Sequence, residues 1–270
     1  MTPPGSPTLH VRAWPKADSP PTLALLHGFT QNVDCWGRFA DELAATHPLI
    51  AVDAPGHGRS HHDDTDLWRA ADLVAATLAG STPDPPVVIG YSMGGRTALH
   101  LALGHPGAVA GLVLIGATAG IDDPSERAAR RAADEELAVR IESEPLPAFI
   151  DAWLANPLFA GLDPEAACRR ARLTNRPAGL AASLRHCGTG TQEPLWERLG
   201  ELTVPVLLIT GRDDTKFTTL AERLAAAMTA TPAEVVVIDG THAVHLEQPA
   251  ATAAAIARWL DDAVETTEPM

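Results

Sequence analysis

Cysteine is scarce in this chain of 270 residues, and long apolar runs are absent. The three cysteines, Cys35, Cys168 and Cys187, are widely spaced and form no Cys-x-x-Cys motif. This spacing predicts reduced cysteines in a cytoplasmic protein, none of them a metal ligand or a nucleophile. No apolar run reaches the roughly 18 residues of a transmembrane helix. The first seven residues lack the basic and apolar segments of a signal peptide, so none is expected.

Positive charge is also in short supply. Lys and Arg number 20 against 34 Asp and Glu, which gives a formal net charge of −14. This balance argues against nucleic acid and anionic membranes as partners, because both would be repelled. In a protein with this negative charge, local groups of arginines are candidate binding sites for an anionic ligand. The hydrophobic fraction of 46% is enough for a full core, and we expect a monomer or small homo-oligomer.

Short apolar runs that alternate with helical patterns set the expected fold. Runs typical of buried strands occur at residues 22–26, 49–52, 87–90, 111–116, 204–211 and 234–238, and residues 9–14 alternate like an edge strand. Residues 121–200 contain only helical or irregular patterns. We therefore predict an α/β protein with a doubly wound, mostly parallel sheet and a helical cap insertion. The predicted core comprises residues 1–120 and 201–270, and the predicted cap residues 121–200.

One segment organises the rest of the chain: the apolar run before Gly90-x-Ser92-x-Gly94 and the helical pattern after it. This context is typical of a nucleophile elbow, which exposes a serine hydroxyl at a strained turn. The two glycines would remove side chains where the strand and the helix pass closely. The bare motif also occurs by chance in Gly-rich turns, so its weight depends on partners elsewhere in the chain.

Acid and histidine partners for Ser92 follow the last two predicted strands. Asp214 and His242 each follow one strand end, where functional residues collect in parallel sheets, and the order Ser, Asp, His suits this fold. The histidine would take the serine proton, and the carboxylate would fix the histidine tautomer. Asp213 competes with Asp214, which has the better spacing from the strand end. His245 competes with His242, which comes directly after the turn.

An oxyanion hole is predicted beside the serine. His27-Gly28-Phe29 follows an early strand, and the backbone N–H groups of Phe29 and Met93 would point at negative charge on a substrate oxygen. One such donor is typically worth ~3 kcal/mol. His27 itself is interpreted as structural, bracing the loop.

Arginines form a second group of candidate residues. Arg96 lies four residues after the elbow serine, so a helix would place it on the same face one turn further on. The spacing alone fits a surface or packing arginine equally well. In the predicted cap, Arg127, Arg130 and Arg131 form one basic face. The pattern favours a solvated face there, with Glu126 paired to Arg130.

Aromatic residues accompany arginine later in the cap. Trp153 and Phe159 precede Arg172. This combination suits a ligand with a carbocyclic ring and carboxylates, because arginine binds a carboxylate in a bidentate fork.

Together these segments resemble the α/β-hydrolase superfamily over nearly the whole chain. The resemblance is carried by Leu26-His27-Gly28-Phe29, the turn at residues 53–60, the elbow, Gly211-x-x-Asp214 and His242. Finer features resemble the 2-succinyl-6-hydroxy-2,4-cyclohexadiene-1-carboxylate (SHCHC) synthases of menaquinone biosynthesis. These are Tyr91 with Arg96, residues 211–217, and the cap segment 149–159. Thr30, where a serine can stand, and Leu154, where an aromatic residue can stand, depart from that family.

The resemblance implies an α/β-hydrolase fold and a lyase. The family reaction is a 2,5-elimination that releases pyruvate from 2-succinyl-5-enolpyruvyl-6-hydroxy-3-cyclohexene-1-carboxylate, a small anionic carbocycle. The catalytic residues would be Ser92, Asp214 and His242. The implied substrate-binding residues are Arg96, Arg130, Arg172, Tyr91, Trp153 and Phe159. No metal and no organic cofactor is implied.

Two other classes of protein remain open. The same three catalytic residues serve serine hydrolases, either carboxylesterases or carbon–carbon bond hydrolases, acting on a small carboxylated substrate. Ring-fission hydrolases commonly have Asn where this chain has Tyr91, which counts against them. A non-catalytic binding protein of this fold usually lacks a member of the triad, whereas this chain contains all three.

Overall fold

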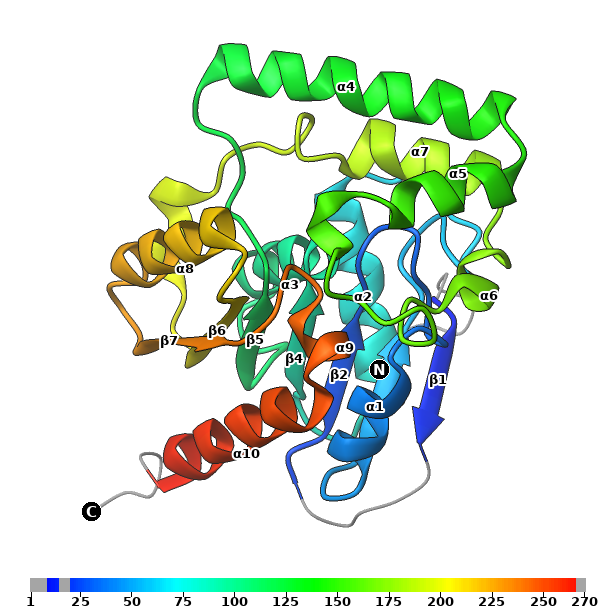
Figure 1. The fold of residues 1–270 in the computed structure, drawn as a ribbon. Coiled ribbons are helices and arrows are strands. Elements are labelled where there is room, and N and C mark those ends of the chain that lie inside the picture. Colours follow the sequence, from blue (N-terminus) through cyan, green and yellow to red (C-terminus); the bar gives the residue numbers. More distant parts are fainter. Residues whose placement is uncertain (1–8, 15–19, 266–270) are drawn as a thin grey trace.

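The computed structural model describes residues 9–14 and 20–265, and within them a seven-stranded sheet lies between helices (Figure 1). The strand order is β1-β3-β2-β4-β5-β6-β7. β1 runs antiparallel to β3, and the other described pairs are parallel. The predicted doubly wound, mostly parallel sheet is therefore confirmed. The strands are β1 (Val11–Trp14), β2 (Leu23–Leu26), β3 (Leu49–Val52), β4 (Val87–Tyr91), β5 (Gly111–Ile115), β6 (Val206–Gly211) and β7 (Ala233–Ile238).

Alternate side chains of the central strands enter two separate apolar layers, because successive residues of a strand face opposite sides of the sheet. Leu23 and Leu25 of β2 belong to one layer, and Ala24 and Leu26 belong to the other. Strands β2 to β6 are buried throughout, whereas β1 and β7 at the two edges are partly exposed. Continuous apolar runs therefore mark the strands that are covered on both faces.

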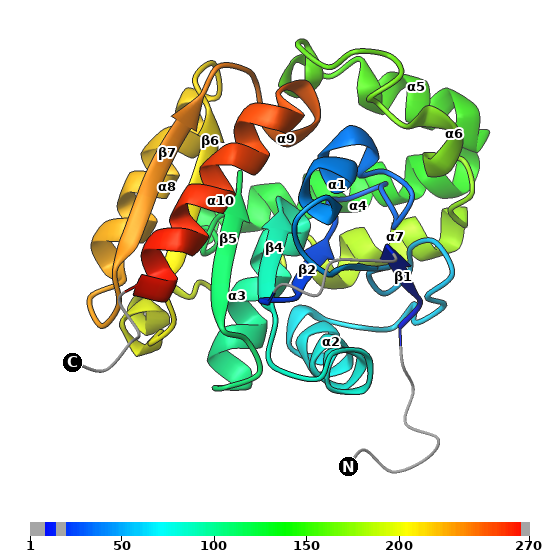
Figure 2. The ribbon, with the colours of Figure 1, turned by 90° about the horizontal axis from the view of Figure 1, so that it is seen from below.

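Helices cover both faces of the sheet (Figures 1 and 2). One face packs against α2 (Leu67–Ser81), α3 (Met93–Gly104) and α8 (Thr215–Ala227). The other packs against α1 (Gly37–Ala44), α9 (Val244–Glu247) and α10 (Pro249–Glu265). None of the described helices is long and apolar enough to cross a membrane.

The chain between β5 and β6 forms a separate group of helices that lies over the sheet. Of these, α4 runs across the top in Figure 1. These helices, called the cap here, are α4 (Pro124–Ser143), α5 (Leu146–Leu154), η1 (Pro157–Phe159), α6 (Arg169–Arg172) and α7 (Pro177–Cys187). α4, α5 and α7 share their own apolar cluster, which includes Ile141, Phe149 and Leu180. The later 3-10 helix η2 (Trp196–Glu201) contacts α3 and α8 instead.

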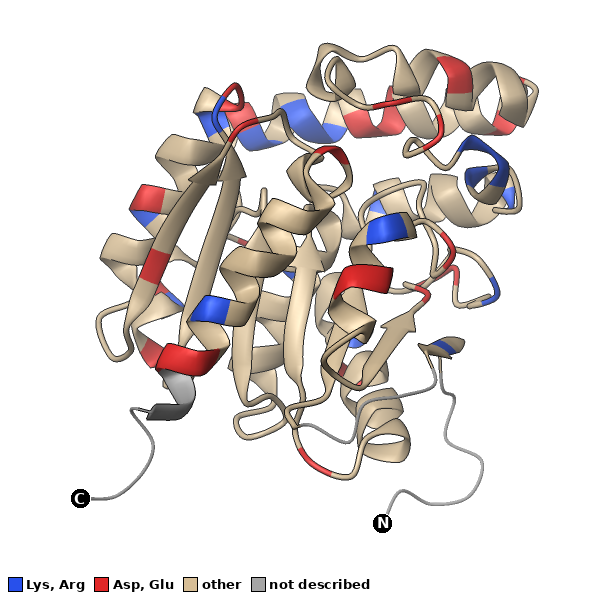
Figure 3. Ribbon diagram, turned by 60° about the horizontal axis from the view of Figure 1, so that its bottom comes forward, with Lys and Arg blue, Asp and Glu red and all other residues tan. Residues whose placement is uncertain are grey.

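Polar contacts fix the cap helices at their ends and on their outer faces. Asp123 caps α4, because its carboxylate accepts the N–H groups of Ser125 and Glu126 at 2.8 and 2.9 Å. On the exposed surface, where acidic and basic residues intersperse along α4 (Figure 3), Arg185 of α7 pairs with Glu135 and Glu142 of α4.

The base of α7 is pressed tightly onto the core. Gly56 has φ +76°, and a Cβ there would lie 2.5 Å from the carbonyl oxygen of Gly179. Asn175 joins the same two parts. Its amide donates to Thr30 O at 2.7 Å, and its carbonyl accepts the Gly58 N–H at 2.7 Å. These contacts place the cap directly above the carboxyl ends of the parallel strands, where the candidate site lies.

Candidate active site

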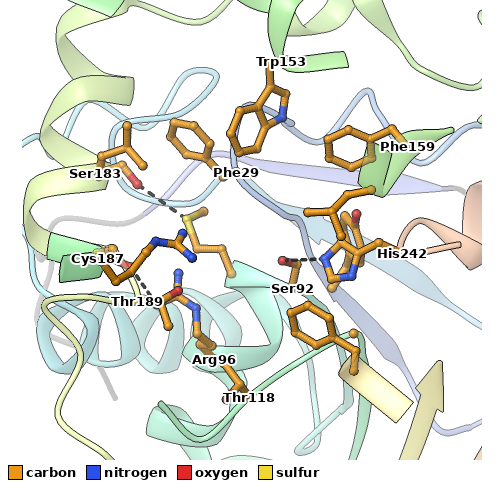
Figure 4. A pocket seen from close by; sticks show the side chains of 18 of the residues that line it. Phe29, Ser92, Arg96, Thr118, Trp153, Phe159, Ser183, Cys187, Thr189 and His242 are labelled. Carbon is orange, nitrogen blue, oxygen red and sulfur yellow. Dashed lines mark hydrogen bonds between the residues drawn. The ribbon is translucent and has the colours of Figure 1, made fainter. Parts of the chain in front are cut away.

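Ser92 stands at the turn between β4 and α3, with φ 52° and ψ −106°. Residues other than glycine rarely adopt positive φ, and such strain often marks a functional site. The strand and the helix approach so closely that a Cβ at Gly90 would lie 2.6 Å from Gly94 O. The segment therefore has the geometry of a nucleophile elbow, with the serine lining a pocket beneath the cap (Figure 4).

His242 lies between the serine and a carboxylate. Its Nε2 is 3.1 Å from Ser92 Oγ, and its Nδ1 is 2.7 Å from Asp214 Oδ2. Asp214 follows β6 at the start of α8, and His242 follows β7. Both are buried, with 7% and 5% of their surfaces exposed. In this arrangement the imidazole can accept the serine proton while the carboxylate holds Nδ1–H.

The two competing residues lie elsewhere. Asp213 is exposed, and its N–H donates to Gly240 O at 3.0 Å. His245 is fully buried among Trp36, Phe39 and Tyr91, and neither of its ring nitrogens has a hydrogen-bond partner in the described structure. Burial lowers the pKa of His245 to about 3, so this ring is neutral and apart from the proton path.

Three neighbours hold the His242 ring in place. The ring centroids of Phe217 and Tyr91 lie 4.4 and 5.4 Å from the imidazole centroid. On another side Gly116 leaves the space that the ring fills, because a Cβ there would come within 2.8 Å of His242 Cε1. Burial raises the pKa of Tyr91 above its usual value, so the phenol stays neutral beside the histidine.

Phe29 and Met93 line the same pocket as the serine. Met93 is the first residue of α3, where backbone N–H groups have no acceptor in a preceding helical turn. The turn that carries Phe29 is fixed by Gln31, whose side chain accepts the Gly28 N–H at 3.0 Å. Both N–H groups therefore belong to short rigid segments beside Ser92.

His27 braces the loop below this turn. Its Nε2 accepts the Ala54 N–H at 2.9 Å, and its Nδ1 donates to Gly28 O at 2.9 Å. Burial lowers its pKa to about 4, which keeps the ring neutral. His27 is fully buried and ties two strand-end loops together.

Aromatic side chains form the wall of the pocket on the cap side (Figure 4). Trp153 of α5 lies 5.2 Å from the Phe29 ring and 6.0 Å from the ring of Phe159 in η1, centroid to centroid. The indole N–H of Trp153 is buried without a hydrogen-bond partner in the described structure. The wall is therefore largely apolar, with one unused donor.

Arg96 lies in the pocket wall and also packs against the cap. Its Nη1 donates to Cys187 O at 2.7 Å and to Gln192 Oε1 at 3.2 Å. Burial lowers its pKa to about 10, so the guanidinium remains charged at neutral pH. Among the described residues no carboxylate forms an ion pair with it, and Asp134 acts on it only from a distance.

Arg130 is the member of the predicted basic face that reaches the pocket. The expected pairing with Glu126 was wrong. Arg130 Nε instead donates to Asp134 Oδ1 at 2.7 Å. Asp134 is 1% exposed and also accepts the Gly190 N–H, so it is a fixed acceptor, whereas Glu126 lies exposed in the first turn of the helix. Arg127 and Arg131 bond to backbone carbonyls outside the pocket.

Arg172 approaches from α6. It is 1% exposed, its Nε donates to Ala167 O at 2.8 Å, and its Nη1 contacts Phe29 O and Thr30 Oγ1. It lines the pocket, and no carboxylate among the described residues forms an ion pair with it. A buried cation without an anion is costly, and Arg96 and Arg172 are two pocket residues whose charge no carboxylate among the described residues balances by an ion pair.

The structure gives a place in the site to residues for which the sequence suggested no role there. Lys216 and Phe217, in the first turn of α8, line the pocket, and Gln192 holds Arg96. The first two belong to segment 211–217, which carried part of the family resemblance but was given no binding role. Asp134 could have been found by the i, i+4 rule that suggested Glu126. Nothing in the local sequence marks Gln192, which comes from the segment between the cap and η2.

Comparison with known proteins shows the family. A model of the alpha/beta hydrolase family matches residues 23–255. The SHCHC synthase of Escherichia coli O1:K1 / APEC is 32% identical over 255 residues, covering 93% of this chain and 98% of that relative. The SHCHC synthase of Photorhabdus laumondii subsp. laumondii is 34% identical over 216 residues, covering 78% and 77%. The chain belongs to the alpha/beta hydrolase family.

Solved structures give the same fold. MenH from S. aureus superposes with a TM-score of 0.85 at 27% identity, covering 94% of this chain and 98% of that one. The enol-lactonase from Burkholderia xenovorans LB400 superposes with a TM-score of 0.78 at 21% identity, covering 94% and 96%. The second likeness shows the shared fold alone. The predicted α/β-hydrolase fold is confirmed, and the curated relatives carry the name SHCHC synthase.

Proposed function

We propose that the protein is an SHCHC synthase, a lyase of menaquinone biosynthesis. It would eliminate pyruvate from 2-succinyl-5-enolpyruvyl-6-hydroxy-3-cyclohexene-1-carboxylate by using Ser92, His242 and Asp214 as a base. The names of the relatives favour this reaction among those that the fold supports. No metal or organic cofactor is part of the proposal, and the substrate is the expected partner.

The observation that carries the proposal is the pairing of one serine–histidine–aspartate arrangement with three arginines around one pocket. Ser92, Arg96, Arg130 and Arg172 line that pocket, and two of the arginines are buried without a carboxylate partner in the described structure. A neutral ester needs no such cations, whereas a substrate with several carboxylates would pair with each of them. Arg130, held by Asp134, offers its remaining donors to the same ligand.

The proposed chemistry begins with proton transfer. His242 Nε2 takes the proton of the Ser92 hydroxyl, and Asp214 stabilises the imidazolium that results. Ser92 Oγ then removes a proton from the ring carbon of the substrate, so no acyl-enzyme needs to form. The N–H groups of Phe29 and Met93 would hold the enolate-like charge that develops.

Elimination follows from the carbanion. The electron pair of the carbanion forms a new ring double bond, the existing ring double bond shifts by one position, and the bond between a second ring carbon and the enolpyruvyl oxygen breaks. The electron pair of that bond leaves with enolpyruvate, which becomes pyruvate on taking up a proton. Arg96, Arg130 and Arg172 would orient the carboxylates during this step. Tyr91, Trp153 and Phe159 would pack against the carbocycle and exclude water.

The test is pyruvate release from the proposed substrate, measured with a coupled dehydrogenase. The spontaneous decay of the substrate is subtracted, and Ser92→Ala is the control. The proposal expects fast release that depends on the serine, with weak hydrolysis of a p-nitrophenyl ester in parallel. Ester turnover without release above background would instead assign the pocket to a serine hydrolase.

A further inference from the structure

Cys35 and Cys168, far apart in the sequence, meet where the cap contacts the core. Cys35 lies between β2 and α1, and Cys168 directly precedes α6, with φ +55°. The Cys168 thiol donates to Cys35 O at 3.3 Å, and each of the two side chains shifts the pKa of the other. The sequence spacing predicts reduced cysteines with no nucleophile among them, and the fold brings two of the three side by side.

The two cysteines differ in access. Cys35 is 1% exposed. Cys168 is half-buried and lines an open surface hollow together with Asp34, Arg170 and Thr174. A small oxidant in solution can therefore reach Cys168 directly, while Cys35 lies behind it.

The surroundings also divide the two thiols chemically. The hydrogen bond from Cys35 lowers the pKa of Cys168, and the Arg172 guanidinium lowers it further, whereas partial burial and Asp34 oppose this. Burial raises the pKa of Cys35 well above its usual value. Because the thiolate is the reactive form, we expect Cys168 to react first with an oxidant and Cys35 to react only afterwards, with the oxidised Cys168.

We propose that Cys168 and Cys35 are a peroxide-oxidisable pair that forms a disulfide between α6 and the segment after β2. The Cys168 thiolate attacks hydrogen peroxide, so an S–O bond forms, the O–O bond breaks, and the released hydroxide becomes water on protonation. The Cys35 sulfur then attacks the Cys168 sulfenic acid. An S–S bond forms, the S–O bond breaks, and a second water leaves. Two thiols lose two electrons in total, and one peroxide is reduced to two waters.

The disulfide would form where α6 of the cap contacts the core. Arg172, four residues after Cys168, already contacts Phe29 and Thr30 in the segment that leads to Cys35. The disulfide would fasten this edge of the cap to the core covalently. Because it closes a long loop and so restricts the unfolded chain, the oxidised protein should melt several degrees higher than the reduced one.

Cys187 provides an internal control. It is buried, its thiol donates to Thr65 O at 3.0 Å, and burial raises its pKa to about 12. In the reduced wild-type protein, iodoacetamide should therefore label Cys168 about tenfold or more faster than Cys187. Equal labelling of the two thiols would contradict the reactivity assigned to Cys168.

The decisive experiment treats the reduced protein with stoichiometric hydrogen peroxide, followed by thiol blocking and mass spectrometry. The expected product is a monomer that has lost two hydrogen atoms, with a peptide linking Cys35 to Cys168 and one blocked thiol at Cys187. Dithiothreitol should reverse both the link and the rise in Tm. A link between two chains, or peroxide consumed without a 35–168 link, would overturn the proposal.

Two variants separate the steps. In Cys35→Ser, peroxide should leave a sulfenic acid on Cys168 that dimedone traps. In Cys168→Ser, Cys35 should stay reduced. Circular dichroism verifies that each variant is folded, and Cys35→Ala replaces Cys35→Ser if the serine is not tolerated. These readouts do not use the lyase reaction, so their outcome is independent of the proposed function.

Discussion

The two sides of the pocket are built by different means. On the core side, Ser92, Asp214 and His242 each follow a strand end, so the parallel sheet alone brings them together. On the cap side, Arg130 and Arg172 are held by individual side-chain and backbone contacts made across the cap. The core side therefore supplies the serine–histidine–aspartate arrangement, and the cap side adds charged side chains to the same pocket.

The proposed proton transfer depends on the triad, whereas the proposed binding of substrate carboxylates depends on the arginines. A change in the triad should affect kcat for every substrate, because the proton path serves all of them. A change in a pocket arginine, whether in the cap or, like Arg96, in α3 of the core, should affect the anionic substrate alone.

Asp214→Asn should cause the largest loss. Without the carboxylate the histidine loses its fixed tautomer, and kcat for pyruvate release should fall roughly 10³–10⁴-fold. Asp213→Asn is the matched control, because Asp213 is exposed and the carboxylate hydrogen-bonded to His242 is that of Asp214; it should retain kcat within about twofold. Comparable losses in both variants, measured by steady-state kinetics, would contradict the assignment of Asp214.

Arg172→Met should cost less and act differently. Removing a buried cation that is proposed to pair with a substrate carboxylate should lower kcat/KM for pyruvate release about a hundredfold. Hydrolysis of a neutral ester should change little. Arg170→Met, two residues away and exposed, is the control and should behave like the wild type. If Arg172→Met affected both substrates equally, its role would be structural.

Asp134→Asn tests the ion pair between Asp134 and Arg130, which the structure has in place of the expected pair between Glu126 and Arg130. The amide can still accept the Gly190 N–H but no longer carries the charge that fixes Arg130. KM for the anionic substrate should rise about tenfold with kcat nearly unchanged. Glu126→Gln should leave KM and kcat unaltered. A change in either parameter would indicate that Glu126, rather than Asp134, pairs with Arg130.

As the pH falls, the core should lose stability at a higher pH than the cap does. His27, His57 and His245 are buried and have pKa values of about 4, 3 and 3 because of burial. These values are below the unfolded value, so the unfolded chain binds more protons between about pH 6.5 and 4 and stability falls as pH falls through that range. The cap carboxylates Glu135 and Glu142 have lowered pKa values through Arg185, so their ion pairs persist at pH 5.

His245→Phe checks this with the smallest expected effect. At pH 7 the variant should be near the wild type. Between pH 7 and pH 5 it should lose on the order of 1–2 kcal/mol less free energy of unfolding than the wild type does. Urea unfolding at the two pH values measures the difference. Identical losses in both proteins would show that His245 does not contribute to acid sensitivity.

The sequence predicted the sheet and the elbow because both depend on local patterns. Buried runs such as residues 87–90 and the glycines beside Ser92 allow few alternatives once a strand must meet a helix. The proximity of Asp214 and His242 followed from the fold, since parallel strands end at a common edge.

The cap could not be predicted to the same degree. Arg130 has carboxylates on both sides at helical spacing, and burial of Asp134 against Gly190 decides between them. Gln192 and Cys168 acquire their partners through contacts spanning 96 and 133 residues, which no local pattern encodes. Tertiary packing, rather than spacing, determines these pairs.

Recognition by arginine is tested most directly by comparing two reactions in Arg96→Met, because the Arg96 guanidinium lines the pocket beside the triad and its removal leaves the triad intact. Pyruvate release and p-nitrophenyl ester hydrolysis are measured on the same folded preparation. We predict that kcat/KM for release falls about a hundredfold while ester hydrolysis stays within about threefold of the wild type. A parallel fall in both reactions, or no fall in release, would contradict the division between a catalytic core and charge recognition by arginines.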